Sequence, residues 1–364
     1  MLARRGGWES SASPFLCAAL RLLLVTAALP SLVTAVTRKN LKPAAVSPWR
    51  TLSGDAPSIV AKGGFSGLFP DSSEYAYKFS YVAGSPDTIS WCDVRLTKDG
   101  KGICLPNLVI DNCTTIGDVY PDGKTNYIVN GETTSGWFSV DYDMKTLLPV
   151  SLKQDIYSRS NKFDGIFPIL TVDDLVEQVK PAPIWLNIQH DLFYRQHNLS
   201  MRSYLLSLTR HVILSHVSSP ELGFLSSIAG RLKKSKTKLI FRFLGEDTAE
   251  PSTNMTYGSL LKNLTFVKTF ATGILVPKHY IWPVTSNGYL QPYTSFVMDA
   301  HKEGLEVFAS DFANDAMLSY NYSYDPLAEV LSFIDNGIFS VDGILTDFPI
   351  TPSEAIGDDV ILDS

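Results

Sequence analysis

The sequence lacks several of the patterns that assign a protein class directly. Beyond the first 35 residues it has no apolar run long enough to cross a membrane. No glycine-rich GxGxxG loop follows the first expected strand. The formal net charge of −6 argues against a nucleic-acid-binding protein. The acidic C-terminus carries no hydrophobic tail, so we expect no glycosylphosphatidylinositol (GPI) signal in this chain.

Cysteine is scarce, which limits the disulfide bonds that can form. Four cysteines occur, and Cys17 lies in an N-terminal segment that we expect to be removed. Cys92, Cys104 and Cys113 remain, so at most one pair forms within the chain. Cys92 and Cys104 lie on consecutive expected strands and could pair. Three unpaired thiols are the equal alternative.

The N-terminus has the parts of a secretory signal peptide. Arg4 and Arg5 precede an apolar run, Leu22–Ala35, which ends in the small residues VTA. A membrane anchor is the alternative, but the run has only 14 residues and contains Pro30. We therefore expect a signal peptide over 1–35, a linker over 36–56, and a secreted or cell-surface protein without a transmembrane segment in the mature chain.

Five N-x-S/T sequons support the same secretory route. One sequon is weak evidence, but five behind a signal peptide indicate a glycoprotein. The candidate glycosylation sites are Asn112, Asn198, Asn254, Asn263 and Asn321.

Apolar runs of strand length alternate with segments of helical periodicity along most of the chain. The expected strands are 58–61, 89–96, 102–105, 184–189, 211–215, 239–244, 273–276, 306–310 and 343–346. The expected helices are 73–82, 172–179, 200–208, 223–232, 260–269, 293–303 and 326–336.

This alternation predicts an α/β protein with a parallel sheet covered by helices. About eight strand–helix units over 57–353 fit a TIM (β/α)8 barrel. An open doubly wound sheet is the alternative. Segment 108–169 is rich in Asp, Gly, Asn and Thr, and we interpret it as a small insertion after the third strand. Residues 354–364 are expected to form a short acidic tail.

Functional side chains of such barrels lie at the carboxyl ends of the strands. The first expected strand ends at Lys62 and Gly63, and the second carries Trp91 and Asp93. The third ends at Pro106 and Asn107, and the fourth at Asn187, Gln189 and His190.

Motifs at these ends resemble those of the glycerophosphodiester phosphodiesterase family. GxSGxxP at 64–70 precedes DVRLTKDG at 93–100, and IDNCTT at 110–115, FPILT at 167–171 and VDGILTDFP at 341–349 follow in the family's order. The resemblance covers about 57–353 of this chain. It is nearest to the N-terminal barrel of the plant glycerophosphodiester phosphodiesterase-like proteins, which carry two barrels in tandem and a GPI anchor.

The resemblance implies a reaction. A glycerophosphodiester and water give an alcohol and sn-glycerol 3-phosphate, a step of glycerol and phospholipid metabolism. Two histidines act as general acid and base. Three carboxylates hold a divalent cation, calcium or magnesium, which polarises the phosphodiester.

This sequence departs from the family at both catalytic pairs. By the resemblance, the first His-Arg pair corresponds to Lys62 and Gly63, and the His-Asp pair to Pro106 and Asn107. Proline carries no proton to exchange. A lysine would act near neutral pH only if its pKa fell by about three units. We therefore expect that neither Lys62 nor Pro106, at the positions of the two histidines, acts as a general acid or base.

The metal-binding set departs as well. The family's glutamates of the second and fourth strands correspond to Trp91 and Gln189, so Asp93 alone remains. One carboxylate rarely holds a divalent ion. Asp93 is expected to bind metal weakly or to be a structural carboxylate, and Trp91 to fill the space of the missing ion or to stack on a sugar.

Other polar residues have a functional and a structural interpretation. Lys62 and Arg242 are candidates for binding an anionic substrate; a solvated lysine and an outward-facing arginine are the alternatives. Because strand side chains alternate, His190 is expected to face away from the barrel if Gln189 faces it. His301 is expected on the surface of a helix, and Asp347 to be structural.

Three functional hypotheses follow. The first is a secreted barrel of this family with little or no catalysis, which binds a cell-wall glycan or a glycerophosphodiester headgroup. The second is an active metal-dependent phosphodiesterase with an unusual site. The third is a truncated product whose second barrel and anchor are missing.

Overall fold

The computed structural model describes residues 47–179 and 183–362, except for the side chains of 179 and 358–362. The expected signal peptide and most of the expected linker lie outside these residues. Within the described ranges, no helix is both long enough and apolar enough to cross a membrane.

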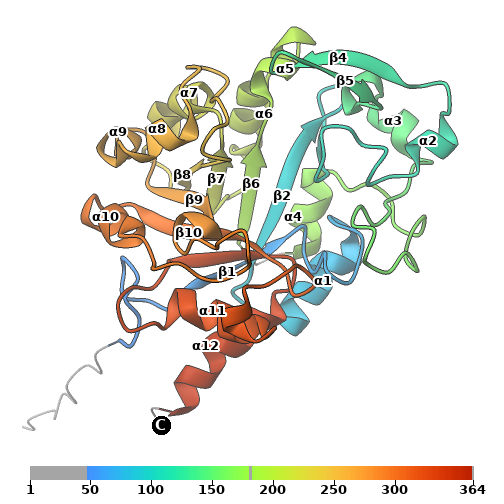
Figure 1. The fold of residues 1–364 in the computed structure, drawn as a ribbon. Helices are drawn as coiled ribbons and strands as arrows, with labels where there is room; N and C mark the ends of the chain where they lie inside the picture. Colours follow the sequence, from blue (N-terminus) through green and yellow to red (C-terminus); the bar gives the residue numbers. More distant parts are fainter. Residues whose placement is uncertain (1–46, 180–182, 363–364) are drawn as a thin grey trace, which may run out of the picture. The chain divides into compact units, whose positions relative to one another are not determined.

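Eight parallel strands close into a barrel (Figure 1). They are β1 (Ser58–Lys62), β2 (Ile89–Leu96), β6 (Ile184–Ile188), β7 (His216–Ser219), β8 (Lys238–Arg242), β9 (Gly273–Pro277), β10 (Glu306–Phe312) and β11 (Gly343–Thr346). Each strand pairs with the next, and β1 pairs with both β11 and β2, which closes the ring. The predicted TIM barrel is confirmed.

Helices connect the strands along the outside of the barrel (Figure 1). Those that match the expected helices are α1 (Glu74–Ala83), α4 (Val172–Val179), α6 (Met201–Leu208), α7 (Leu222–Leu232), α10 (Phe296–Lys302) and α11 (Pro326–Ile334). Two further helices, α5 (Asp191–Gln196) and α12 (Ile350–Leu362), were not predicted. The second of these runs through most of the segment expected as an acidic tail.

Side-chain caps explain where several helices begin. Ser73 Oγ accepts a hydrogen bond from Ala76 N at the start of α1, and Asp325 caps α11, whose first residue is Pro326. A cap also corrects one prediction. The helix expected at 260–269 is divided into α8 (Tyr257–Leu261) and α9 (Leu264–Lys268), because Asn263 Oδ1 accepts from Phe266 N and begins a new helix.

The inside of the barrel is filled by side chains. One buried cluster consists of Val60, Ile89, Trp91, Trp185, Ile240, Leu275, Phe308 and Leu345. His216 stacks on Trp185 with ring centroids 4.5 Å apart, and burial lowers its pKa to about 3, so this imidazole is a neutral core group. The space for a ligand is therefore at the mouth of the barrel, above the packed interior.

The expected insertion follows the third strand of the chain. This strand, β3 (Gly102–Cys104), runs antiparallel to β2 and lies beside the ring. The insertion holds α2 (Ile116–Val119), a hairpin of β4 (Thr125–Val129) and β5 (Glu132–Gly136), η1 (Ser139–Asp141) and α3 (Met144–Leu147). Its residues Ile110, Leu152 and Phe167 belong to a buried cluster that also includes Ala76 of α1 and Ile103 of β3.

Two of the three cysteines pair. Cys92 on β2 and Cys104 on β3 form a disulfide, with Cα atoms 5.2 Å apart. Cys113 is a free, buried thiol, and burial raises its pKa. Of the two alternatives left open by the sequence, the structure contains the disulfide.

The strand expected at 211–215 is wrong. The amides of His211 and Val212 bond back to the carbonyl of Leu208, so this segment continues the helical turn after α6. The strand β7 begins only at His216.

Candidate functional site

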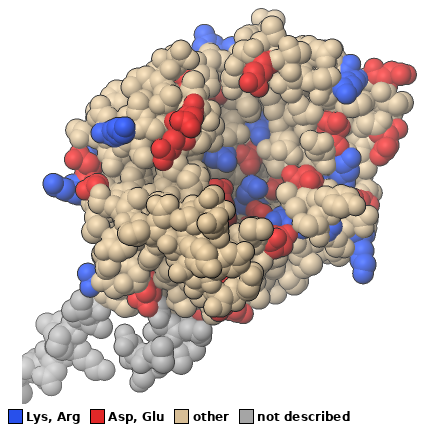
Figure 2. Space-filling model, viewed as in Figure 1, with Lys and Arg blue, Asp and Glu red and all other residues tan. Residues whose placement is uncertain are grey.

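A cavity of about 350 Å³ opens at the carboxyl ends of β1, β8, β10 and β11. Figure 2 shows basic and acidic groups side by side in a hollow of this face. The charged residues that line the cavity are Lys62, Arg159, Arg242, Asp311, Asp315 and Asp347. Three cations and three carboxylates therefore meet in one small space.

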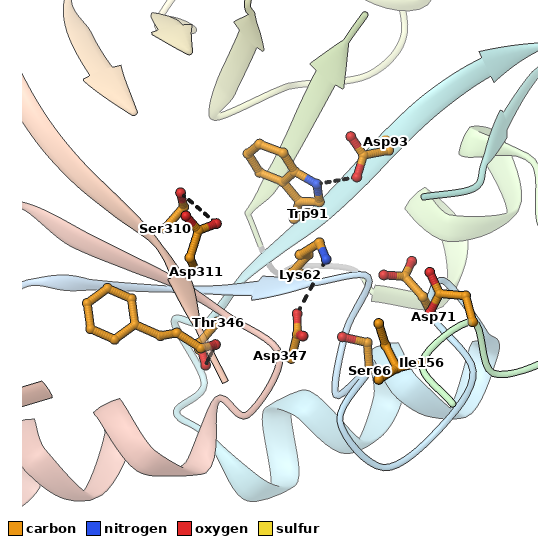
Figure 3. Close-up of polar contacts among 12 residues, drawn as sticks. Lys62, Ser66, Asp71, Trp91, Asp93, Ile156, Ser310, Asp311, Thr346 and Asp347 are labelled. Carbon is orange, nitrogen blue, oxygen red and sulfur yellow. Dashed lines mark hydrogen bonds and ion pairs between the residues drawn. The ribbon is translucent and has the colours of Figure 1, made fainter. Parts of the chain in front are cut away.

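Lys62 lies in the middle of this site (Figure 3). Its Nζ is 3.6 Å from Asp347 Oδ1, and 38% of its side chain is exposed. Burial lowers the pKa of Lys62, but the carboxylates of Asp347, Asp71, Asp93 and Asp155 outweigh it and raise the pKa to about 12. A general base at neutral pH needs the opposite shift, so Lys62 is a fixed positive charge.

Arg159 brings the end of the insertion onto the barrel. Its Nε and Nη2 donate to Asp315 at 2.8 and 3.1 Å, and Nη2 also donates to Asp347 at 2.7 Å. The arginine side chain is only 6% exposed. Asp347 thus neutralises two cations, Arg159 and Lys62, and the expectation of a structural role for it agrees with these contacts.

Asp93 is buried, and both of its carboxylate oxygens already accept hydrogen bonds. Trp91 Nε1 donates to Oδ2 at 2.8 Å, and Asn187 Nδ2 donates to Oδ1 at 2.6 Å. Asn187 Oδ1 in turn accepts from Ser218 Oγ at 2.7 Å. The donors that fix Asp93 are therefore side chains of β2 and β6, tied to β7.

The Arg242 side chain makes no hydrogen bond within the described residues, but it contacts Trp91 and Asp93. Its guanidinium lies over the Trp91 ring, 5.6 Å from the centroid. Its Nη1 is 3.9 Å from Asp93 Oδ1, which is beyond hydrogen-bond distance. The sequence named two candidate residues for binding an anion, Arg242 and Lys62. Both line the cavity.

Gly63 has a backbone conformation that favours glycine. Its φ is +57°, and a Cβ there would overlap the carboxylate of Asp71. Asp71 is itself buried and accepts from Ser72 Oγ at 2.7 Å. Burial raises the pKa of Asp71 to about 7, against the opposing effect of Lys62.

Pro106 and Asn107 contribute backbone rather than acid–base groups. Their carbonyls accept hydrogen bonds from the buried Arg95, at 2.7 Å from Nη2 and 3.0 Å from Nε. Asn107 Nδ2 also donates to Asp155 at 3.2 Å. Arg95 therefore holds this loop against β2.

His190 lies closer to the site than strand alternation suggests. β6 ends at Ile188, and His190 has a left-handed backbone with φ 64°, so the alternation stops before it reaches Gln189. Burial, together with Arg95 and Arg242, lowers the pKa of His190 to about 3. The half-buried imidazole is thus neutral, at the edge of the site.

His301 corrects another expectation. It lies on α10, but its Nε2 is 2.8 Å from the buried Asp342, and only 16% of its side chain is exposed. It packs against the barrel rather than facing solvent.

The comparisons with known proteins agree with this architecture. No family model matches the chain. Glycerophosphodiester phosphodiesterase GDPDL3 of Arabidopsis thaliana is 56% identical over 311 residues, which cover 85% of this chain and 41% of that protein. GDPDL1 of the same plant is 53% identical over 311 residues, with the same coverage. The chain belongs to the glycerophosphodiester phosphodiesterase family. It spans about two fifths of the length of these curated relatives.

Solved structures share the fold of this family member. A putative glycerophosphoryl diester phosphodiesterase from Silicibacter pomeroyi superposes with a TM-score of 0.56 at 14% identity, over 84% of this chain and 94% of that one. An Oleispira antarctica phosphodiesterase, solved with sn-glycerol-3-phosphate, has a TM-score of 0.55 at 14% identity, over 84% and 99% of the two chains.

The side chains of this family member do not fit a divalent cation of the kind expected from the resemblance. Calcium takes six to eight oxygen ligands, and octahedral magnesium takes one or two carboxylates together with waters or substrate phosphates. Each Asp93 oxygen already accepts one hydrogen bond, Trp91 presents an N–H donor, and Gln189 offers one neutral amide oxygen. In the part of the chain that the structure describes, no three His, Cys, Asp or Glu side chains are grouped to hold a metal.

The sequence placed Asn187 at a strand end without giving it a role, and it missed Arg159 as a member of the site. Asn187 lies on β6 two residues after Trp185, whose side chain fills the barrel, so alternation could have placed Asn187 inward as well. Arg159 comes from an irregular loop, where no periodicity indicates which way a side chain points.

The five sequon asparagines, Asn112, Asn198, Asn254, Asn263 and Asn321, are all exposed. Exposure is what an attached glycan requires.

Proposed function

We propose that this barrel is a secreted, glycosylated binding protein of the cell surface or cell wall that has little or no phosphodiesterase activity. The observation that carries the proposal is the state of Asp93. Its two oxygens are taken by Trp91 and Asn187, so the last carboxylate of the family's metal set is committed to protein donors. A carboxylate bonded in this way stabilises the fold, and an ion at either oxygen would have to share that oxygen with a protein N–H donor.

The positions of the acid and base support the same proposal. Pro106, at the position of the second histidine, has no titratable side chain. Lys62 stays protonated at neutral pH because four carboxylates surround it. Proton transfer to and from a phosphodiester would then lack both partners.

The ligand that we propose is a glycerophosphodiester headgroup or a wall glycan. Arg242 and the partly exposed Lys62 supply charge for a phosphate, and Ser310 and Asp311 supply hydroxyl and carboxylate partners for a polyol. The disulfide favours an oxidising compartment, which agrees with a secretory route.

Hydrolysis is tested directly. Purified protein is incubated with glycerophosphocholine, with calcium, with magnesium, and with a chelator, and sn-glycerol 3-phosphate is measured. We expect release no higher than from the Asp93→Ala variant. Cation-dependent release that Asp93→Ala abolishes would instead establish an active phosphodiesterase, the reaction printed in the names of the curated relatives.

Binding is tested by isothermal titration with glycerol 3-phosphate and, separately, with wall oligosaccharides. Arg242→Met is expected to weaken binding of the phosphate ligand about tenfold, since a charged hydrogen bond contributes about 1.5–3 kcal/mol. An unchanged affinity would remove Arg242 from the site. Absence of heat with both ligands would refute the binding proposal.

A further inference from the structure

Three exposed tyrosines form a row outside the central cavity. Tyr289, Tyr320 and Tyr324 are 56%, 49% and 72% exposed. Their ring centroids are 5.3 Å apart for Tyr289 and Tyr320, and 6.1 Å apart for Tyr320 and Tyr324. We call this row the tyrosine shelf. A contiguous exposed patch of aromatic side chains usually marks a surface that binds another group.

The shelf is held in place by its two loops. Gly288 O accepts from Tyr320 N and from Ser319 Oγ, both at 2.9 Å. Gly288 has φ +81°, and a Cβ there would stand only 3.0 Å from the Tyr320 ring. The close approach of the loops therefore depends on glycine. The rings are already ordered before anything binds. A group that packs on them therefore gives up little binding free energy to order them.

A sequon lies in the middle of this shelf. Asn321 is exposed and stands next to Tyr320 in the turn η3 (Tyr320–Tyr322). Its Oδ1 accepts from Leu290 N at 2.9 Å and from Ser319 Oγ at 3.2 Å. Leu290 follows Tyr289, so these bonds place Asn321 beside two of the three rings. With Oδ1 held by the protein, Nδ2 is the atom left for a glycan.

We propose that the glycan attached to Asn321 packs against the tyrosine shelf and covers it. The proposal rests on the glycosylation included in the proposed function. The occupant is part of the same molecule, because the covalent bond to Nδ2 fixes the first sugar next to Tyr289 and Tyr320. No diffusing ligand has to find the surface, and the effective concentration of the sugar is high.

The chemistry of the surroundings suits a sugar. A sugar ring has an apolar C–H face that packs on an aromatic ring, and tyrosine adds a hydroxyl at its edge. A groove of about 530 Å³ adjoins Tyr320 and is lined by Thr285, Ser286 and Asn287, which offer hydroxyl and amide partners. The charged lining residues Lys278 and Glu329 pair with each other at 2.6 Å. The groove is thus electrically balanced, as a neutral oligosaccharide requires.

The test uses the full chain secreted from a eukaryotic host. Ser323→Ala removes the sequon but leaves Asn321 and its bonds to Leu290 and Ser319 in place. The matched control is Thr265→Ala, which removes the sequon of Asn263, on the exposed start of α9. Glycopeptide mass spectrometry first measures occupancy at Asn321. Tyrosine nitration is then mapped residue by residue, with the fully exposed Tyr157 as an internal standard.

In the wild-type protein we expect Asn321 to be occupied and the three shelf tyrosines to be nitrated several-fold less than Tyr157. In Ser323→Ala their nitration rises several-fold, whereas Thr265→Ala leaves it unchanged. Loss of the packed sugar also lowers the melting temperature of Ser323→Ala by about 2 °C.

Two results would overturn the inference, and they differ in meaning. An unmodified Asn321 together with unmodified Asn112, Asn198, Asn254 and Asn263 would also remove the glycoprotein part of the proposed function. An occupied Asn321 with shelf tyrosines as reactive as those of Ser323→Ala would refute the packing alone. The shelf would then be open to an external oligosaccharide.

Discussion

At the scale of single residues, donors decide what each carboxylate in the site does. Asp93 accepts two side-chain N–H groups and is part of the barrel's polar packing. Asp347 forms ion pairs with two cations, Lys62 and Arg159, and so links β1 to the insertion. Asp71 has a single hydroxyl donor and deep burial, which raises its pKa to about 7. The same residue type therefore has three roles within one site.

Asp71 makes a prediction for the pH dependence of stability. Its pKa is about 7 in the folded protein and 3.8 ordinarily, so between these values the folded state holds a proton that the unfolded state releases. Stability must then fall as pH rises through this window and level off above it. Asp71→Asn cannot titrate and lacks this contribution.

We therefore expect the free energy of unfolding of the wild type, relative to Asp71→Asn, to fall between pH 4 and pH 7 by up to about 1.4 kcal/mol per pH unit. Denaturant unfolding at several pH values measures it. Parallel pH profiles for the two proteins would show that Asp71 is ionised in the folded state.

At the scale of elements, the disulfide is the bond that fixes β3 beside the barrel. Cys92 and Cys104 are separated by 12 residues, so they close a short loop that contains the turn between β2 and β3. Leu105 N bonds to Asp93 O, and Cys104 N bonds to Leu170 O. The disulfide thus supports the strand that carries Asp93 and the start of the insertion.

Replacing both cysteines by alanine should lower the free energy of unfolding by about 3 kcal/mol, the value of the chain-entropy estimate for a loop of this size. Reductant should lower the melting temperature of the wild type and of Cys113→Ala, whose disulfide is intact. It should leave Cys92→Ala/Cys104→Ala unaffected. Wild type that melts equally with and without reductant would contradict a stabilising disulfide.

The elements of the barrel could be predicted because its strands are short, buried runs separated by helical periods. The hairpin of β4 and β5 was missed, although its turn, Asn130-Gly131, is a strong local hairpin signal. The strands on either side of this turn contain many polar residues, so they lack the apolar run that indicates a strand.

The site was predictable in part. Lys62 and Arg242 are the last residues of β1 and β8, and Asp93 lies within β2, so the fold places all three. The position of His190 depends on a left-handed backbone after β6, and the contacts of Arg159 depend on an irregular loop. Neither the left-handed backbone nor the irregular loop produces a periodic pattern of apolar residues, so the sequence did not predict these positions.

At the scale of the whole described molecule, the insertion and the barrel share one rim. Arg159 in the insertion contacts Asp315 after β10 and Asp347 after β11, and Asp347 also contacts Lys62 at the end of β1. The guanidinium additionally lies 5.4 Å from the centroid of the Phe348 ring. One side chain therefore fixes the loop that borders the cavity.

Arg159→Met should loosen this loop while the barrel stays folded. Removing one partner of a buried ion pair leaves a carboxylate uncompensated, which costs about 3–5 kcal/mol. We expect the lower end of that range, because Lys62 still pairs with Asp347. Urea unfolding measures the loss, and trypsin cleavage at the exposed Lys162 should become faster. Arg210→Met, at an exposed position, is the control and should change stability by less than about 0.5 kcal/mol. If Arg159→Met matched that control in both measurements, the insertion would be held by the apolar cluster that it shares with α1 and β3, and the rim contacts would contribute nothing to its position.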